Sequence, residues 1–262
     1  MKNSFEFIFS LFALLLSFII VHAAYVGLIR PKAEAFMNEQ DAMMEVNPDY
    51  VPERSIFVVI QDFEQEACFI LMFWALAILG FKYWDANNQK KLLELDFIGL
   101  PEDTPVTPAI SPKIIKNIET IPPRQQEFLL PRLLTGSLGR FVSTKNVQDA
   151  ATEINSLCDQ ESDRLDSEMS IIRYIAWAIP SFGFIGTVRG IGEALSQAHR
   201  AVEGDITGVT RHLGVAFNST FIALAISIVL MFIIHQVQLY QDRLVHKSGQ
   251  YCSERLINRL SP

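Results

Sequence analysis

The sequence has few charged residues and few cysteines. Charged side chains make up 19% of the 262 residues, whereas hydrophobic side chains make up 50%. A typical soluble domain has roughly 25% charged residues, and a disordered chain has more charge and fewer apolar side chains. The three cysteines, Cys68, Cys158 and Cys252, are too few and too widely spaced to indicate a disulfide framework or a zinc site. The apolar excess must therefore lie in a large core or in a membrane.

Motifs of the common enzyme classes are missing as well. The chain has no P-loop, no G-x-S-x-G sequence and no H-E-x-x-H sequence, and its five histidines have no metal-ligand spacing. A net charge of −7 argues against a general nucleic-acid binder, which needs a basic surface. We therefore expect no enzymatic activity, no cofactor and no nucleic-acid partner.

Much of the apolar excess is concentrated in four runs. These are Phe5–Ile29, Ala67–Phe81, Tyr174–Leu195 and Leu213–Val237. A bilayer core of about 30 Å requires about 20 helical residues, and the first and last runs meet this length outright. The second run is shorter, but Tyr83 and Trp84 extend it and resemble an interfacial belt. We expect an all-α polytopic membrane protein with four transmembrane helices.

The first run has an alternative interpretation as a secretory signal. Lys2, the apolar stretch and the small residues around Ala23 fit such a signal and its cleavage site. The apolar stretch continues to Ile29, however, which makes it long enough to span a bilayer. We favour an uncleaved first helix.

Lysine and arginine residues near the ends of the runs favour a cytoplasmic location for both termini. The expected segments follow from this orientation. They are transmembrane helix 1 at 1–30, an outer segment at 31–66, helix 2 at 67–85, a cytoplasmic domain at 86–172, helix 3 at 173–196, an outer loop at 197–212, helix 4 at 213–237 and a cytoplasmic helical tail at 238–262.

The expected cytoplasmic part has two contrasting patterns. Residues 101–123 contain six prolines, which rule out one continuous helix, and we expect a loop there. Residues 146–172 repeat apolar side chains at three- and four-residue steps among acidic ones, which predicts an amphipathic helix with an acidic face. No Gly or Pro follows before Pro180, so one long helix should run on into the third apolar run. The 238–262 tail should pack on it, and its acidic face is either solvated or docks a partner.

Small residues form a stripe on each of the last two apolar runs. Along the third run the stripe consists of Gly183, Thr187, Gly190 and Ala194, and along the fourth of Ala216, Thr220, Ala223 and Ser227. Each stripe carries one Thr, about 10–12 Å below the outer end of its helix at 1.5 Å per residue. Two interpretations stay open: close helix packing, with Thr bonded to its own helix, or a polar lining that offers hydroxyl oxygens to water or a cation.

Three further residues stand out in the third run. Arg189 and Glu193 are four residues apart and can neutralise each other across one turn, as a structural bridge or as an ion-steering pair. Pro180 should kink the helix and free a carbonyl one turn earlier. No Asp or Glu lies near the middle of any apolar run, so a titrating carboxylate on a proton path would have to come from a partner.

The two stripes lie within motifs that resemble those of the MotA/TolQ/ExbB proton channel family. Residues 180–190 read P-S-F-G-F-I-G-T-V-R-G and are similar to the family pattern P-x-x-G-x-x-G-T-V-x-G. Residues 213–224, L-G-V-A-F-N-S-T-F-I-A-L, resemble the second family motif, in which a Thr follows an alanine-rich start. The resemblance covers about residues 165–245, and the other two helices agree in layout only.

The resemblance implies a homopentamer in the bacterial inner membrane around a small subunit with one transmembrane helix, similar to MotB, TolR or ExbD, that carries a titrating Asp. It implies that flow of H⁺ or Na⁺ is coupled to movement, which a cytoplasmic or envelope effector receives. The ion-pathway residues it implies are Thr187, Thr220, Ser219, Asn218 and Ser227. The motif residues that support them are Pro180, Gly183, Gly186, Gly190, Ala216 and Ala223.

The sequence also departs from the family. Val215 stands where ExbB and TolQ carry a Glu, and the Arg189–Glu193 pair is not typical. Four helices indicate a MotA-like layout, although the motifs are closer to TolQ and ExbB. Our principal hypothesis is an ion-driven motor or energiser subunit. The alternative is a membrane-anchored scaffold that docks a partner on the 146–172 helix and conducts no ions.

Overall fold

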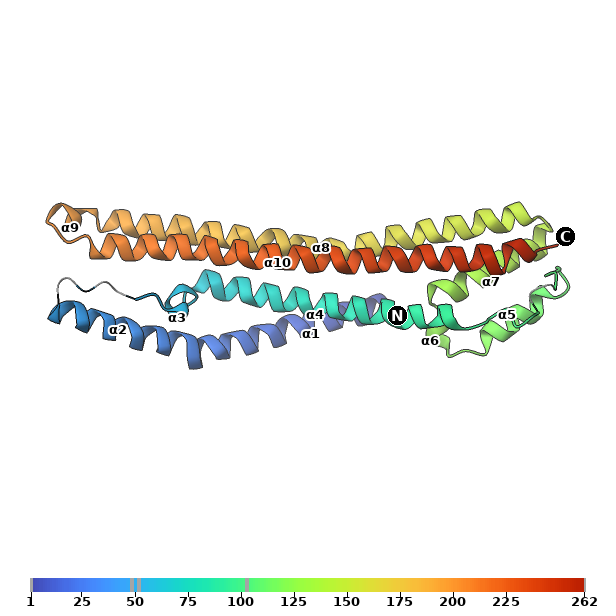
Figure 1. Cartoon of the computed structure of the whole chain (residues 1–262), viewed down its shortest axis with the longest axis horizontal. Helices are drawn as coiled ribbons and strands as arrows, with labels where there is room; N and C mark the ends of the chain where they lie inside the picture. The colour runs from blue at the N-terminus through green and yellow to red at the C-terminus, as the bar shows by residue number, and fades with distance from the viewer. Residues whose placement is uncertain (1, 48–49, 51–52, 102–103, 262) are drawn as a thin grey trace. The chain divides into compact units, whose positions relative to one another are not determined.

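The computed structural model describes residues 2–47, 50, 53–101 and 104–261, with side chains from residue 6 onward. Helices account for most of this part of the chain, and it contains no β-strand (Figure 1). The longer helices are α1 (Lys2–Ala24), α2 (Arg30–Val46), α4 (Phe63–Lys91), α7 (Leu129–Thr144), α8 (Val147–Ser196) and α10 (Thr207–Arg255). The shorter ones are α3 (Ile56–Val59), α5 (Ser111–Glu119), α6 (Pro123–Gln126) and α9 (Ala198–Val202).

The chain divides into two units. Unit 1 comprises residues 1–79 and 171–234, and unit 2 comprises residues 80–170 and 235–262. Helices α4, α8 and α10 contribute residues to both. As expected, the acidic segment and the third apolar run form one continuous helix, α8, which contains Pro180.

Four helical stretches among the described residues are long and apolar enough to cross a membrane. They are the stretch formed by α1 and α2, and the helices α4, α8 and α10. A π-helical turn at Tyr25–Ile29 joins α1 to α2, directly before Pro31, whose missing N–H leaves the Gly27 carbonyl without its usual donor. The prediction of an all-helical chain with four membrane-crossing helices is confirmed.

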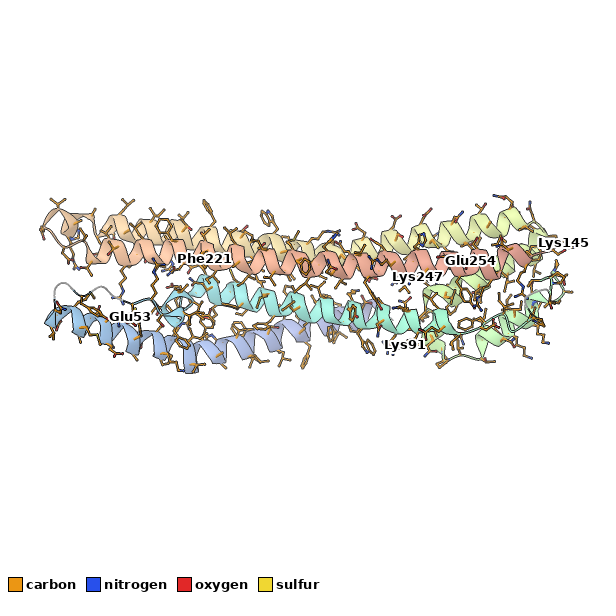
Figure 2. The ribbon with its side chains drawn as sticks, viewed as in Figure 1. Glu53, Lys91, Lys145, Phe221, Lys247 and Glu254 are labelled. Atoms are coloured by element: carbon orange, nitrogen blue, oxygen red, sulfur yellow. The ribbon has the colours of Figure 1, made fainter. Side chains whose placement is uncertain are left out.

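Unit 1 exposes many large apolar side chains on its outside. Side chains project along the outside of the α1 ribbon (Figure 2), where Phe7, Leu11, Phe12 and Leu15 are exposed. On α10, Phe217 and Phe221 are also exposed. Such surfaces are unfavourable in water and favourable in lipid, where a helix satisfies its own backbone.

Unit 2 has a conventional apolar core. One face of α7 supplies Leu130, Leu133, Leu134 and Leu138, and the core also contains residues from α5, α8 and the end of α10. The α10 tail contributes Leu256 and Cys252, which pack with Ile154 of α8. The expectation that the tail packs on the 146–172 helix is therefore confirmed.

The expectation of a loop throughout residues 101–123 is wrong in part. Residues 111–119 form α5, and Ile114 and Ile118 of this helix are buried in the core of unit 2. Pro112 lies in the first turn of α5, where a missing N–H costs nothing, so a proline-rich stretch can still contain a helix. Val106 pairs with Leu260 in an isolated bridge, which fixes the segment before α5 to the tail.

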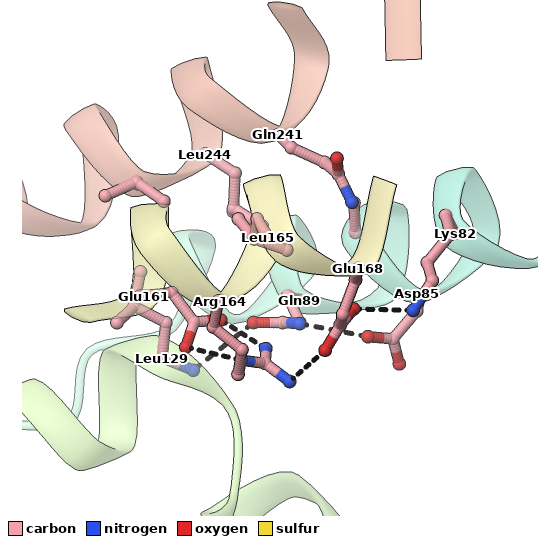
Figure 3. A pocket seen from close by; sticks show the side chains of 12 residues that line it. Lys82, Asp85, Gln89, Leu129, Glu161, Arg164, Leu165, Glu168, Gln241 and Leu244 are labelled. Atoms are coloured by element: carbon pink, nitrogen blue, oxygen red, sulfur yellow. Dashed lines mark hydrogen bonds and ion pairs between the residues drawn. The ribbon is translucent and has the colours of Figure 1, made fainter. Parts of the chain in front are cut away.

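The acidic face of α8 is not uniformly solvated. Glu161 is 3% exposed and accepts hydrogen bonds from Arg132 of α7 at 3.1 Å and from Arg164 (Figure 3). Arg164 also bonds Glu168, which pairs with Lys82 of α4. Two guanidinium groups neutralise Glu161 and so permit its burial. Asp159 and Asp163 of the same helix are exposed, as expected.

Candidate functional site

Thr187 of α8 and Thr220 of α10 meet within unit 1, where the two helices lie side by side (Figure 1). Their hydroxyl groups are hydrogen-bonded to each other. Thr187 Oγ1 also lies 3.1 Å from the Ala216 carbonyl, and Thr220 Oγ1 lies 3.1 Å from the Gly183 carbonyl. Each hydroxyl has a single proton, so two O–H groups face more acceptors than they can bond at once. The protons of this pair can change partners without movement of a heavy atom.

Three glycines of α8 allow the two helices to approach this closely. A Cβ atom on Gly186 would lie 2.5 Å from Ser219 Cβ, and one on Gly190 would lie 2.8 Å from Ala216 Cβ. A Cβ atom on Gly183 would overlap Ala223. The small residues therefore provide close packing, and this packing is the reason that the two hydroxyl groups meet. The two interpretations of the stripes are not exclusive.

Ser227 serves the backbone of α8. Pro180 has no N–H, so the Ala176 carbonyl lacks the donor that a continuous helix would supply. The hydroxyl of Ser227 donates to that carbonyl at 3.4 Å. The bond thus lies about two turns from Thr220 along α10 and about three turns from Thr187 along α8, and its geometry points to helix pairing.

Ser219 and Asn218 precede Thr220 on α10. Ser219 is buried, donates to the Val215 carbonyl at 2.9 Å and lies 3.4 Å from Gln65 Nε2, which donates to it. Asn218 is half-buried. Ser219 therefore connects α10 to α4, next to the threonine pair.

The first turn of α4 contains three buried polar residues that the sequence analysis missed. Glu64, Gln65 and Glu66 are 8%, 0% and 6% exposed, respectively. Gln65 contacts α10 through Ser219, Glu64 contacts Arg189 of α8, and Glu66 contacts the first helix. Successive residues of a helix point about 100° apart, so three neighbours can reach three different helices. The expected apolar run begins at residue 67, but helix α4 begins at Phe63. Glu64, Gln65 and Glu66 are therefore part of this helix, and they pack against the other helices of unit 1.

Arg189 is the centre of an ionic cluster. Its guanidinium donates to both oxygens of Glu64, at 2.7 and 2.9 Å, and lies 3.6 Å from Asp62. The expected partner Glu193 also accepts a hydrogen bond from the guanidinium, at 3.2 Å. The other carboxylate oxygen of Glu193 lies 2.9 Å from His212 Nδ1. Three carboxylates and one histidine surround a single permanent cation. A carboxylate therefore does reach the depth of Arg189 in unit 1, although no Asp or Glu lies in the middle of an apolar run.

Glu66 joins α4 to the first helix. It bonds His22 at 2.6 Å and pairs with Arg30. The Arg30 guanidinium also lies 4.5 Å from the centre of the Phe63 ring, within the range of a cation–π contact. The signal that could have revealed this arrangement is the match of two acids just before one apolar run with His22 and Arg30 at the end of another.

The described residues contain no group of three or more His, Cys, Asp or Glu side chains arranged to hold a metal ion. The chemistry that this site can perform is hydrogen bonding and charge compensation. The two threonine hydroxyl groups do not titrate near neutral pH.

Comparison with known proteins identifies the segment that carries the site. Residues 125–249 match the model of the MotA/TolQ/ExbB proton channel family. The match spans α7, α8 and most of α10, and it contains both motifs. No curated protein and no solved structure matches the chain. The resemblance drawn from the two motifs is confirmed: residues 125–249 of this multi-pass membrane protein are similar to the MotA/TolQ/ExbB proton channel family.

Proposed function

We propose that this chain is the inner-membrane subunit of an ion-driven complex that conducts H⁺ or Na⁺ past Thr187 and Thr220 and converts the ion gradient into mechanical work. The observation that carries the proposal is the hydroxyl pair formed by these two residues within the part of the chain that matches the family. Oxygen atoms suit hard cations and protonated water, and a pair with rearrangeable protons can pass hydrogen bonds along a path.

A partner subunit completes the path. A threonine hydroxyl does not titrate near neutral pH. The three carboxylates that reach this level, those of Asp62, Glu64 and Glu193, all contact Arg189, and Glu64 is held on it by both of its oxygens. A carboxylate that binds and releases a proton must therefore come from another chain, and the family relationship favours a small single-helix subunit with an Asp, similar to MotB, TolR or ExbD.

The assembly and its orientation follow the family pattern. We place five copies of the chain around the partner helix, with both termini and unit 2 in the cytoplasm, because lysine and arginine near the helix ends favour that side. Unit 2 would then be the part that an effector contacts on the cytoplasmic side, whereas an envelope effector would act through the partner.

The test is ion flux through the reconstituted complex. The chain is purified together with the single-helix protein encoded next to it, placed in lipid vesicles, and assayed with H⁺- and Na⁺-sensitive dyes under an imposed potential. T187V/T220V keeps the shape of both side chains but removes both hydroxyl groups, and should abolish flux while the complex still assembles. T187S/T220S keeps the hydroxyl groups and should retain flux.

Two results would count against the proposal. Normal flux in the valine variant would show that the threonine pair is not on the path. An assembled wild-type complex that conducts neither ion would favour the scaffold function instead.

A further inference from the structure

Arg189 places a permanent positive charge next to the proposed ion path. It follows Thr187 by two residues on α8, which corresponds to about 3 Å along the helix axis. Its side chain is 35% exposed and extends from α8 toward the start of α4. An isolated guanidinium at this level would repel every cation that approaches the threonine pair.

Glu64 is placed to cancel this charge. It accepts two parallel hydrogen bonds from the guanidinium, at 2.7 and 2.9 Å, which is the strongest geometry available to such a pair. Its side chain also adjoins the pore helix itself, since a Cβ atom on Gly186 would lie 3.1 Å from Glu64 Cγ. The compensating negative charge is therefore packed against α8 at Gly186, the residue before Thr187, and not at a distant point of the surface.

The Arg189–Glu64 pair is surrounded by more carboxylates than are needed to neutralise one guanidinium group. Asp62 and Glu193 also contact Arg189, and His212 contacts Glu193. Asp62 Oδ2 and Gln65 Oε1 are buried acceptor atoms that lack a hydrogen-bond partner among the described residues. Asp62 is the residue before α4, and Gln65 lies in the first turn of this helix. Both oxygen atoms can accept a hydrogen bond or bind a cation, so they favour a positively charged ion at this position.

We infer that Glu64 is the charge-selecting residue of the ion path: by neutralising Arg189 it keeps the approach to Thr187 and Thr220 open to cations. This inference rests on the proposed function. Glu64 acts here through Arg189 and through the electric field, and is not itself the group that carries the proton.

The experiment compares E64Q, R189Q and the double variant E64Q/R189Q in the reconstituted complex with its partner. Glutamine keeps the size of Glu64 and one acceptor, but leaves the Arg189 charge uncompensated by its principal partner. One unit charge at ~8 Å and an effective dielectric constant of ~20 corresponds to ~2 kcal/mol, so H⁺ or Na⁺ flux should fall on the order of 30-fold in E64Q. R189Q should conduct at least as well as the wild type, and the double variant should return to within about threefold of it.

E66Q provides the matched control. Glu66 is similarly buried and is also paired with an arginine, but its partners lie on α1 and α2 and not on α8. Its flux per assembled complex should stay within about threefold of the wild type. Salt gives a second readout that a purely structural contact would not change: because Arg189 is partly exposed, 1 M salt should relieve much of the E64Q defect.

The possible outcomes separate this inference from the proposed function. Wild-type flux in E64Q, or a defect in E64Q that the double variant does not relieve while the complex stays assembled, overturns the inference and leaves the proposed function intact. Loss of assembly in E64Q that salt and the second substitution do not restore also overturns it, since Glu64 would then be a clamp. Absence of flux in the assembled wild-type complex overturns both.

Discussion

Gly190 of α8 lies directly against the backbone of Ala216 in α10: a Cβ atom at Gly190 would lie 2.8 Å from the Ala216 nitrogen and 2.8 Å from the His212 carbonyl oxygen. Neither of these backbone atoms can move without its helix. The contact therefore fixes how closely α8 and α10 approach, and with it whether Thr187 and Thr220 can meet.

Gly190→Ala should separate the two helices. We expect a loss of about 1–3 kcal/mol of stability, the usual cost of an overpacked contact, and a loss of ion flux greater than the loss of assembled complex. Thermal unfolding in detergent and vesicle flux measure the two effects. Gly192→Ala is the matched control on the same helix, because a Cβ atom there meets nothing within 4 Å. It should be neutral or stabilise the helix by up to about 1 kcal/mol. Equal effects of the two substitutions would contradict the packing argument.

Ser227→Ala should reveal its dependence on Pro180. The substitution removes the donor to the Ala176 carbonyl, and in a membrane helix such a bond contributes about 0.5–1 kcal/mol. Pro180→Ala restores a backbone N–H at that position and gives the carbonyl its ordinary helical donor. In the Pro180→Ala background, Ser227→Ala should therefore cost less than in the wild type. A double-mutant cycle of unfolding free energies measures the difference, and strict additivity would show that the two residues do not cooperate.

Glu161→Ala should destabilise unit 2. The substitution removes the carboxylate shared by Arg132 and Arg164, whose side chains are 38% and 34% exposed, and the loss of these charge-assisted hydrogen bonds should cost about 1–2 kcal/mol. Asp163→Ala, two residues further along α8 and exposed, should change stability by less than about 0.5 kcal/mol. Limited proteolysis and thermal unfolding of the full chain give the comparison. A similar stability for both variants would mean that Glu161 contributes only as a surface charge does.

Some features were accessible from the sequence because they repeat along a single helix. The steps of three and four that place Gly183, Thr187 and Gly190 on one stripe follow from the helix period alone. So does the absence of any Gly or Pro between the acidic part of α8 and Pro180, which predicted the continuous helix that the structure contains. The family relationship was accessible for the same reason, since both motifs are local strings.

Other features were not accessible, because they depend on what lies opposite. Glu64, Gln65 and Glu66 form a polar string before an apolar run, and such a string is compatible with a solvated membrane boundary. Their burial depends on the helix start at Phe63 and on Arg189, Ser219 and His22, which come from distant parts of the chain. The role of the threonine pair in ion conduction stays a prediction.

By itself the sequence determined the class of the protein: four apolar helices, two small-residue stripes with one threonine each, and a likeness to a proton channel family over residues 125–249. These are properties of hydrophobicity and helical period, which depend on neighbours along the chain. Only the tertiary structure decided that Arg189 pairs chiefly with Glu64 and that Glu161 is buried. A charge can be buried only where an opposite charge meets it, and the meeting of residues more than a hundred positions apart is settled by packing in three dimensions.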